Sequence, residues 1–394
     1  MNKHFFKTFE FEFEVYRLLW YSAAGGSDFA EVAATTERIK DGDYNSWHIE
    51  WKKLAEKTAA RAKSFKQKET SGNACLRASR YYQTAEFFLP PDEPQKKALY
   101  DQAVQLFYQG LDAKQVRYFF HTIPYQDIFL RTVLFPAVGS ARGTVYICGG
   151  FDALLEELYF TNAKYLTENG YDVILYEGPG QSDAIRTYQR PFTADWDQVA
   201  GAVKKFYQDK YSLSEYTIGM GLSLGGLLLA RAASLQPELY DKVILYNYFP
   251  SMLASFKSSM PKFFHRYVDQ GFPPLLEKIA AYVISRQAYL NWQVTHASWV
   301  MGATGLNDLL LRCRELNEEL AYEKLTTDVL ILAGEQEHFY AAELAVAFYK
   351  RIPAVNKKLI LFNKEIYSTD LHCEVGSGYD ANDQIVEWIS GVGG

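Results

Sequence analysis

A serine between two glycines is the first feature of the sequence that could carry chemistry. The motif Gly221-Leu222-Ser223-Leu224-Gly225 has the pattern G-x-S-x-G. The short apolar residues before it are typical of a buried strand that ends at 219 or 220, and those after it suit a helix. A serine on such a tight turn stands clear of its own backbone, at the positive end of the following helix. We therefore predict that Ser223 is a nucleophile and that the Leu224 N–H group helps to hold an oxyanion.

A serine nucleophile needs a base, and the base needs an acid that orients it. When these groups follow in the order serine, acid, histidine, each partner lies on a loop after a later strand. The strand predicted at 328–333 runs into Gly334-Glu-Gln-Glu-His-Phe339. Glu337 is the best acid on this loop, and Glu335 is the reserve candidate.

The base is expected after the last predicted strand, 358–362. His372 is the only histidine beyond that strand, and a helix predicted at about 383–390 closes the chain behind it. We therefore predict His372 as the base. We expect His338, beside the predicted acid, to pack or bond locally instead.

A pair of glycines offers the second half of an oxyanion hole. Gly149 and Gly150 follow a predicted strand at 144–148, where a backbone N–H group can turn toward the serine. The N–H group of Gly150, or of Phe151 beside it, would act together with that of Leu224. A simple tight turn is the alternative.

A second glycine pair, in the segment 178–180, is not a phosphate-binding loop, because the G-K-[ST] ending is missing. We expect this segment to shape the floor of the site.

The elements that must position these groups alternate between strand and helix. This pattern predicts a mainly parallel sheet covered on both faces, which is an α/β fold. The predicted strands outside the serine motif are 116–120, 128–135, 144–148, 172–176, 242–246, 328–333 and 358–362.

The patterns of the remaining segments predict helices. Residues 1–114 form a predicted helical N-terminal domain, although 5–16 fit either a strand or a helix. Residues 115–394 form the predicted sheet domain. Within it, the helical and aromatic segment of about 249–327 is too long for a plain crossover, so we interpret it as an insertion above the active edge of the sheet.

Composition excludes several classes of protein. The 394 residues suit about two domains, and a net charge of −6 with interspersed signs argues against a nucleic-acid partner. The four cysteines show neither a CxxC motif nor zinc spacing, so we expect free thiols. Glu10, Glu12 and Glu14 interrupt any signal-peptide core, and no apolar run approaches a membrane span. We expect a soluble cytoplasmic protein.

Several tracts together resemble one group of α/β hydrolases. This group includes FrsA-like esterases, dihydroxypseudooxynicotine hydrolase and fungal polyketide-shortening hydrolases of pigment pathways. The matching tracts are Ser46-Trp-His-Ile-Glu-Trp-Lys-Lys-Leu-Ala55, Arg77-Ala-Ser-Arg-Tyr-Tyr-Gln-Thr-Ala-Glu-Phe-Phe-Leu89, Gly149-Gly-Phe-Asp152, Glu177-Gly-Pro-Gly-Gln181, 221–226, Asn291-Trp-Gln-Val-Thr-His-Ala-Ser-Trp-Val-Met-Gly302 and His372-Cys373.

The resemblance covers nearly the whole chain and implies more than the motifs alone. It implies an α/β-hydrolase domain with a helical N-terminal domain over the site, a Ser–acid–His triad and no metal. It further implies substrates that are esters or ketones cleaved at a C–C bond flanked by carbonyl groups, and it suggests a homodimer. The acid of the group is usually aspartate in a G-x-x-D loop, whereas Glu337 is one methylene longer.

The sequence thus predicts a cofactor-free serine hydrolase that acts on a small to medium apolar or aromatic molecule. Trp292, His296 and Trp299 are candidate pocket residues, with ordinary core packing as the alternative. Two other functions stay open: a serine peptidase of small peptides, and a non-catalytic ligand-binding protein on a hydrolase scaffold.

Overall fold

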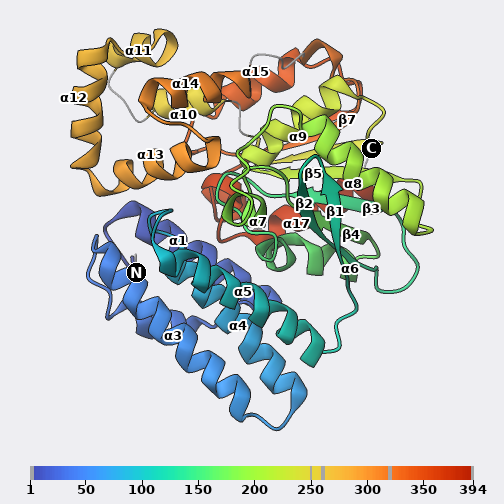
Figure 1. Cartoon of the computed structure of the whole chain (residues 1–394). Helices are drawn as coiled ribbons and strands as arrows, with labels where there is room; N and C mark the ends of the chain where they lie inside the picture. The colour runs from blue at the N-terminus through green and yellow to red at the C-terminus, as the bar shows by residue number, and fades with distance from the viewer. Residues whose placement is uncertain (1–3, 249–250, 259–261, 318–321, 392–394) are drawn as a thin grey trace. The chain divides into compact units, whose positions relative to one another are not determined.

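The chain divides into a helical unit and a larger unit that contains a sheet. The computed structural model describes residues 4–248, 251–258, 262–317 and 322–391 (Figure 1). The helical unit comprises 1–118 together with 159–164, and the larger unit comprises 119–158 together with 165–394. Each unit therefore draws on more than one stretch of chain.

Up to residue 118, the described residues of the helical unit form five α-helices and one short 3₁₀ helix. Residues 5–16, for which the sequence left strand and helix open, mostly fall in the first helix, where Phe11, Val15 and Leu18 are buried at helical spacing. Asp28 and Asp43 cap the next two α-helices by accepting backbone N–H bonds. The helices are α1 (Phe9–Trp20), η1 (Tyr21–Ala24), α2 (Phe29–Thr36), α3 (Tyr44–Ser64), α4 (Lys68–Glu86) and α5 (Pro94–Ala113).

A short segment from later in the chain belongs to this helical unit. It contains a single π-helical turn, η2 (Tyr159–Ala163). The ring of Phe160 lies 5.8 Å from that of Phe107, and the Arg80 guanidinium lies over it. These contacts join residues more than fifty positions apart, which sequence periodicity cannot detect.

The described residues of the larger unit form one eight-stranded sheet. Its strand order is β1-β2-β4-β3-β5-β6-β7-β8, and the strands from β4 to β8 pair in parallel. The strands β3, β4 and β5 are completely buried, which is typical of a parallel sheet covered on both faces. The strands are β1 (Phe119–Tyr125), β2 (Ile128–Phe135), β3 (Thr144–Cys148), β4 (Asp172–Tyr176), β5 (Thr217–Leu222), β6 (Lys242–Tyr246), β7 (Asp328–Gly334) and β8 (Lys357–Phe362).

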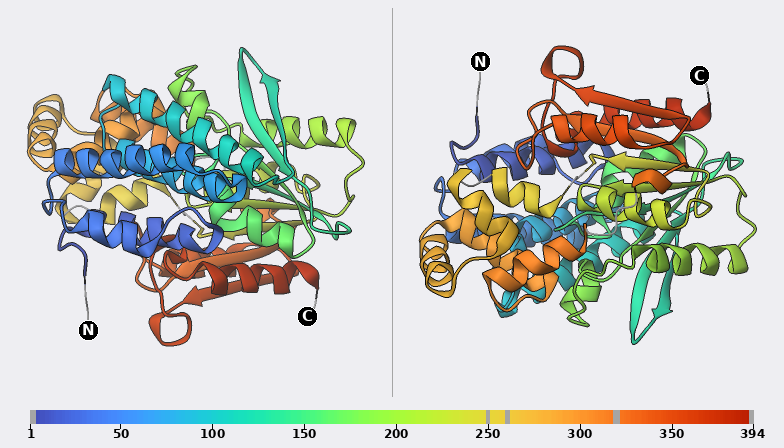
Figure 2. Two further views of the ribbon diagram at one scale, coloured as in Figure 1. Left: turned by 90° about the horizontal axis from the view of Figure 1, so that it is seen from below. Right: turned by 90° about the horizontal axis from the view of Figure 1, so that it is seen from above.

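The sequence predicted the fold class and most strands, but it misplaced the first one. The strand predicted at 116–120 lies instead at Phe119–Tyr125, because it pairs antiparallel with β2 in a tight hairpin. Gln126 closes the turn with φ of 52°. Figure 2 shows this hairpin projecting beyond the rest of the sheet. Cross-strand pairing therefore decided the register that local apolar pattern left ambiguous.

Helices cover the sheet and supply its core. The helix after the serine motif packs against β5 and β6, and Leu227, Leu228 and Leu229 are fully buried. The helix predicted at about 383–390 is longer than expected and packs against β7. These helices are α6 (Lys164–Glu168), α7 (Ser182–Arg186), α8 (Trp196–Lys210), α9 (Leu224–Leu235), α15 (Glu343–Arg351), α16 (Lys364–Tyr367) and α17 (Gly378–Ser390).

Between β6 and β7 the chain forms a group of helices with a small core of its own. That core contains Val268, Phe272, Ile284, Leu306 and Leu310. Of the predicted insertion of about 249–327, residues 249–250, 259–261 and 318–321 lie outside the described part. The elements are α10 (Met252–Ser258), η3 (Lys262–Phe264), α11 (His265–Gln270), α12 (Pro274–Ser285), α13 (Ala288–Met301), α14 (Leu306–Glu315) and η4 (Tyr322–Lys324).

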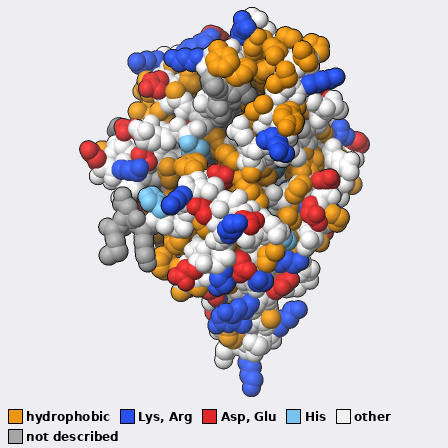
Figure 3. Space-filling view, turned by 90° about the vertical axis from the view of Figure 1, so that its left-hand side faces the viewer, with side chains coloured by type: hydrophobic (Ala, Val, Ile, Leu, Met, Phe, Trp, Pro, Cys, Tyr) orange, Lys and Arg blue, Asp and Glu red, His pale blue; other side chains and the backbone are white. Residues whose placement is uncertain are grey.

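The helix α12 also has an apolar outer face. Four large hydrophobic residues are exposed along it: Leu275, Ile279, Tyr282 and Val283. Figure 3, which faces the left-hand side of Figure 1, shows hydrophobic side chains gathered at the top of the view. No helix in the described ranges is both long and apolar enough to cross a membrane.

The buried strand β7 offers a test of the sheet. Ile331 has no exposed surface, so Ile331→Ala should leave a cavity and lower the free energy of unfolding by about 2–5 kcal/mol. Val355 is 92 % exposed, so Val355→Ala should change it by less than about 0.5 kcal/mol. Urea denaturation measures both, and equal effects would contradict the placement of β7 in the core.

Candidate active site

The serine motif forms a strained turn between β5 and α9. Ser223 has φ of 56° and ψ of −123°, which a residue with a Cβ rarely adopts. Its N–H group donates to the Tyr246 carbonyl at 2.8 Å, so the neighbouring strand β6 holds the turn in place. The side chain is partly exposed at the carboxyl end of the parallel strands.

The glycines of the motif permit a very close approach of backbone to backbone. A Cβ on Gly221 would lie 2.1 Å from the Gly225 carbonyl oxygen. A Cβ on Gly225 would lie 2.5 Å from the carbonyl oxygen of Gly149, at the end of β3. Any larger residue at these two positions would push the turn, or the neighbouring loop, out of place.

The structure brings Ser223, His372 and Glu337 together in one chain of hydrogen bonds. His372 Nε2 lies 2.7 Å from Ser223 Oγ, and His372 Nδ1 lies 2.6 Å from Glu337 Oε2. The histidine belongs to the 3₁₀ helix η5 (His372–Glu374), after β8, and the glutamate to the loop after β7. Their side chains are 5 % and 0 % exposed.

Opposing effects set the charges of this pair. Burial disfavours the imidazolium, but the side chains of Cys373 and Glu337 outweigh it, so the pKa of His372 is raised well above its ordinary value. Burial likewise disfavours the Glu337 carboxylate, but the nearby His372 outweighs it and lowers that pKa. The Phe339 N–H group also donates to Glu337 Oε1 at 3.0 Å.

Glu335 and His338, which lie close to Glu337 on the same loop, have different surroundings. Glu335 is exposed, and its backbone N–H group donates to the Phe362 carbonyl. Its side chain has no recorded contact with His372 in the part of the chain that the structure describes. His338 Nδ1 lies 3.9 Å from Glu337 Oε1, and burial lowers the pKa of His338 to about 4. His338 is therefore neutral at physiological pH.

A second buried carboxyl group lies next to the histidine, and sequence analysis missed it. Glu374 has no exposed surface, and its Oε1 accepts a bond from Asn247 Nδ2 at 3.2 Å. Its Oε2 has no hydrogen-bond partner among the described residues. Burial raises the pKa of Glu374 to about 8, so this group is largely protonated at neutral pH. Only its place beside His372 in the sequence could have drawn attention to it.

The predicted oxyanion loop, Gly149-Gly150-Phe151, lies against Ser223. A Cβ on Gly150 would lie 2.8 Å from Ser223 Cβ and 3.2 Å from Leu224 N. Within the described ranges, neither the Gly150 nor the Phe151 N–H group donates to a recorded acceptor. The loop thus has backbone donors close to the serine that are not used for folding.

The predicted pocket residues all lie on α13 and form an aromatic cluster. His296 packs at 4.9 Å from the Phe151 ring, and its Nε2 lies 3.4 Å from the Phe151 carbonyl oxygen. The rings of Trp292 and Trp299 lie 5.4 Å and 5.6 Å from that of His296. This cluster therefore connects to the oxyanion loop through Phe151. Among the described residues, no group of three or more His, Cys, Asp or Glu side chains is placed to hold a metal ion.

Comparison with known proteins gives similar chains among fungal hydrolases. The 20-hydroxy-prefusarin hydrolase FUS2 of Gibberella moniliformis is 29 % identical, over 99 % of this chain and 97 % of its own. The hydrolase acrC of Aspergillus aculeatus is 25 % identical, over 98 % of this chain and 97 % of its own. The crystal structure of 2,6-dihydroxy-pseudo-oxynicotine hydrolase shares the fold, with a TM-score of 0.73 at 15 % identity and 95 % coverage of both chains.

A family model covers more than half of the chain. The model described as serine aminopeptidase, S33, matches residues 139–366, which include the serine motif and the glutamate loop. The sheet order and the similar solved structure agree with this match. The chain therefore belongs to the serine aminopeptidase S33 family of α/β hydrolases.

Proposed function

We propose that this protein is a serine hydrolase that cleaves an ester, or a C–C bond flanked by carbonyl groups, in a small to medium aromatic or apolar substrate. The observation that carries the proposal is the continuous bonding from Ser223 through His372 to Glu337. A hydroxyl group is a weak nucleophile unless a neighbouring base takes its proton, and this arrangement supplies such a base.

The first half of the reaction forms an acyl-enzyme. Ser223 Oγ attacks the substrate carbonyl carbon while His372 Nε2 takes the hydroxyl proton. Glu337 holds the proton on His372 Nδ1 and stabilises the imidazolium. The negative oxygen of the tetrahedral intermediate is held by the N–H groups of Leu224 and of Gly150 or Phe151.

The second half releases the products. His372 gives its proton to the leaving group, which is an alkoxide for an ester and a stabilised carbanion for a ketone. A water molecule then attacks the acyl carbon, with His372 again taking a proton, and Ser223 leaves with its own proton restored. No cofactor is required in either half.

The aromatic cluster on α13 supports the choice of substrate. Trp292, His296 and Trp299 offer ring faces and edges, which favour flat apolar groups. An aminopeptidase, as the family description would suggest, must hold the ammonium group of its substrate with acidic side chains. Two carboxyl groups close to His372 in the chain or in space have other contacts: Glu337 bonds to His372 itself, and Glu374 bonds to Asn247.

The nucleophile can be tested without knowing the substrate. Purified wild-type protein should react with a fluorophosphonate probe at one residue. Ser223→Ala should abolish labelling, and His372→Ala should slow it about 10³-fold or more, because the hydroxyl then has no base. Labelling is read by intact-protein mass spectrometry.

A buried serine of α9 provides the matched control for this experiment. Ser234→Ala removes a hydroxyl that donates to the Ala230 carbonyl within the same helix, so labelling should not change. A folded wild-type protein that the probe does not label would contradict the proposal and favour a binding protein.

The acid can be identified from the pH profile of an aryl ester substrate. Activity needs neutral His372, so kcat/KM should fall as pH drops through the pKa of His372, which lies above its ordinary value of about 6.5. Glu337→Gln removes the charge that stabilises the imidazolium, so this limb should move to lower pH. The plateau rate should also fall, roughly 10³–10⁴-fold, because the tautomer is no longer held.

Glu335→Gln is the control for the acid, because it changes the reserve candidate on the same loop. Its profile should match that of the wild type. A shifted limb in this variant, with an unchanged profile in Glu337→Gln, would make Glu335 the acid instead.

The substrate class can be tested at the aromatic cluster. Trp292→Ala should lower kcat/KM for aryl esters by about 2–13-fold, the value of one aromatic contact of about 0.5–1.5 kcal/mol. Short alkyl esters should be affected less. Trp388→Ala, at a half-buried tryptophan of α17, should leave the ratio of aryl to alkyl activity unchanged. A loss of stability in Trp292→Ala without a change in this ratio would assign the cluster to packing.

A further inference from the structure

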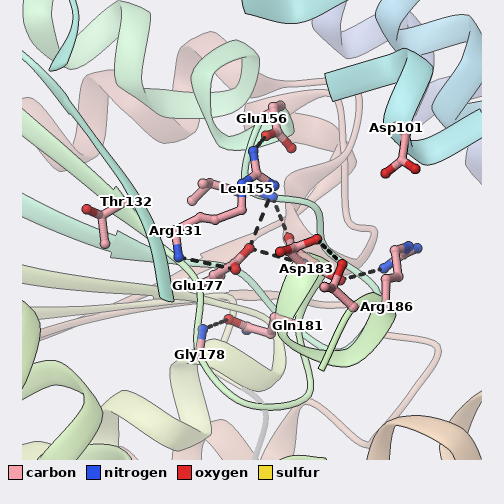
Figure 4. Close-up of polar contacts among 12 residues, drawn as sticks. Asp101, Arg131, Thr132, Leu155, Glu156, Glu177, Gly178, Gln181, Asp183 and Arg186 are labelled. Carbon is pink, nitrogen blue, oxygen red and sulfur yellow. Dashed lines mark hydrogen bonds and ion pairs between the residues drawn. The ribbon is translucent and has the colours of Figure 1, made fainter. Parts of the chain in front are cut away.

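The segment Glu177-Gly-Pro-Gly-Gln181, which follows β4, contacts the oxyanion loop through one side chain. Gln181 is only 3 % exposed. Its Nε2 donates to the Gly149 carbonyl at 2.6 Å and lies 3.2 Å from the Gly150 carbonyl oxygen. Its Oε1 accepts a bond from the Gly178 N–H group at 3.1 Å, which Figure 4 shows as a dashed line.

These bonds determine the direction of two peptide groups. In a trans peptide, the carbonyl and the N–H group point to opposite sides. The Gly149 carbonyl shares its peptide with the Gly150 N–H group, and the Gly150 carbonyl shares its peptide with the N–H group of Phe151. Because Gln181 holds both carbonyls on one side, both N–H groups point away from Gln181. Neither N–H group donates to an acceptor among the described residues.

The amide of Gln181 has little freedom to turn. A Cβ on Gly178 would lie 2.4 Å from the Trp196 ring, and one on Gly180 would lie 2.3 Å from the Phe192 ring. The segment is thus packed closely between two aromatic side chains. Gly180 also has φ of 87°, which a larger residue would adopt only with strain. The Gly178 bond to Oε1 then fixes which end of the amide faces the oxyanion loop.

A buried polar cluster anchors the two ends of this segment (Figure 4). Glu177 accepts N–H bonds from Arg131 on β2 and from Asp183, each at 3.2 Å. Arg131 also forms an ion pair with Glu156, which follows the oxyanion loop. Two buried carboxyl groups face one guanidinium, and burial raises the pKa of Glu177 to about 8. The cluster therefore ties together β2, the Gln181 segment and the chain beyond Phe151.

We propose that Gln181 is a positioning residue that orients the Gly150 and Phe151 peptides so that their N–H groups can hold the oxyanion. This inference rests on the proposed function, because an oxyanion forms only if Ser223 attacks a carbonyl. Gln181 acts through the backbone of the oxyanion loop. Among the described residues, its side chain forms no hydrogen bond with Ser223 or His372. The side-chain amide is needed because it donates to carbonyls and accepts from an N–H group at the same time.

The substitution Gln181→Glu tests this role with almost no change of shape. The carboxylate would place a negative oxygen against the Gly149 and Gly150 carbonyls and turn their peptides. At pH 8 to 9, kcat for an aryl ester should fall about 10²-fold, the typical effect of losing one oxyanion donor. KM should stay near the wild-type value, because the lost interaction is made only in the transition state.

Protonation should reverse part of this loss. A buried carboxyl group favours its neutral form, and its O–H group could then donate to the Gly149 carbonyl as the amide does. The activity of Gln181→Glu relative to wild type should therefore rise as pH falls. Gln181→Met, which has no donor at any pH, should show the same loss of kcat without this recovery, and it decides the question if Gln181→Glu does not fold.

Ser182→Ala, at the residue that directly follows this segment, is the matched control. Ser182 is buried and accepts the Leu155 N–H bond at 2.8 Å, but it makes no recorded contact with the two carbonyls. Its kcat should stay close to that of the wild type, and circular dichroism should report folded protein for all variants.

The outcomes separate this inference from the proposed function. If wild type labels and hydrolyses esters while Gln181→Glu and Gln181→Met keep wild-type kcat, the inference is wrong and the proposed function stands. If KM rises instead of kcat falling, Gln181 binds substrate and the inference is also wrong. If wild type neither labels nor hydrolyses any ester, the proposed function fails, and the inference fails with it.

Discussion

The close approach of three backbone segments at Ser223 is the constraint on which the rest of the site depends. The end of β5, the start of α9 and the loop after β3 meet at distances that only glycine permits, as Gly221, Gly225 and Gly150 show. This approach forces Ser223 into an unfavourable conformation, and the hydrogen bond from its N–H group to β6 holds it there. The hydroxyl therefore lies at the sheet edge, beside the Gly150 and Phe151 N–H groups, which donate to no acceptor among the described residues.

The site also concentrates buried acidic groups around one histidine. Glu337 and Glu374 both lie near His372, but their environments differ. Glu337 is charged because His372 and a backbone N–H group contact its oxygens directly, whereas Glu374 has one amide donor and one oxygen without a partner. Burial therefore keeps the second group largely neutral at neutral pH. One buried carboxylate then faces the histidine, and a second buried negative charge is avoided.

Buried negative charge is also limited in the cluster of Arg131, Glu156 and Glu177, which adjoins the oxyanion loop. Arg131 faces both Glu156 and Glu177, and the raised pKa of Glu177 means that the arginine need not offset two full charges. Next to this cluster, the Gln181 side chain bonds to backbone groups of loops that carry no regular structure. Such loops depend on side-chain partners for their shape, because no ladder of backbone hydrogen bonds supports them. The site is thus held from β2 and β4 as well as from the strands that precede Ser223, Glu337 and His372.

The sequence by itself determined the fold class and the places where reactive residues could stand. Buried parallel strands such as Thr144–Cys148 and Asp172–Tyr176 are short apolar runs bounded by glycine or polar residues, so local pattern was enough to predict them. The edge strand Phe119–Tyr125 was misplaced because apolar and polar residue types do not alternate regularly in its sequence, and because it takes its register from β2. Likewise, the segment 159–164 joined the helical unit through contacts between distant aromatic rings.

Within the site, the sequence could name Ser223, Glu337 and His372 by the order of strand ends, because the carboxyl ends of parallel strands meet at one edge. Only the tertiary structure decided that Glu337 rather than Glu335 reaches the histidine, since neighbouring loop residues point in different directions. It alone revealed Glu374, whose consequence comes from burial, and Gln181, whose bonds reach a loop some thirty residues earlier. Burial and long-range hydrogen bonds depend on where distant segments meet, and no local pattern encodes that.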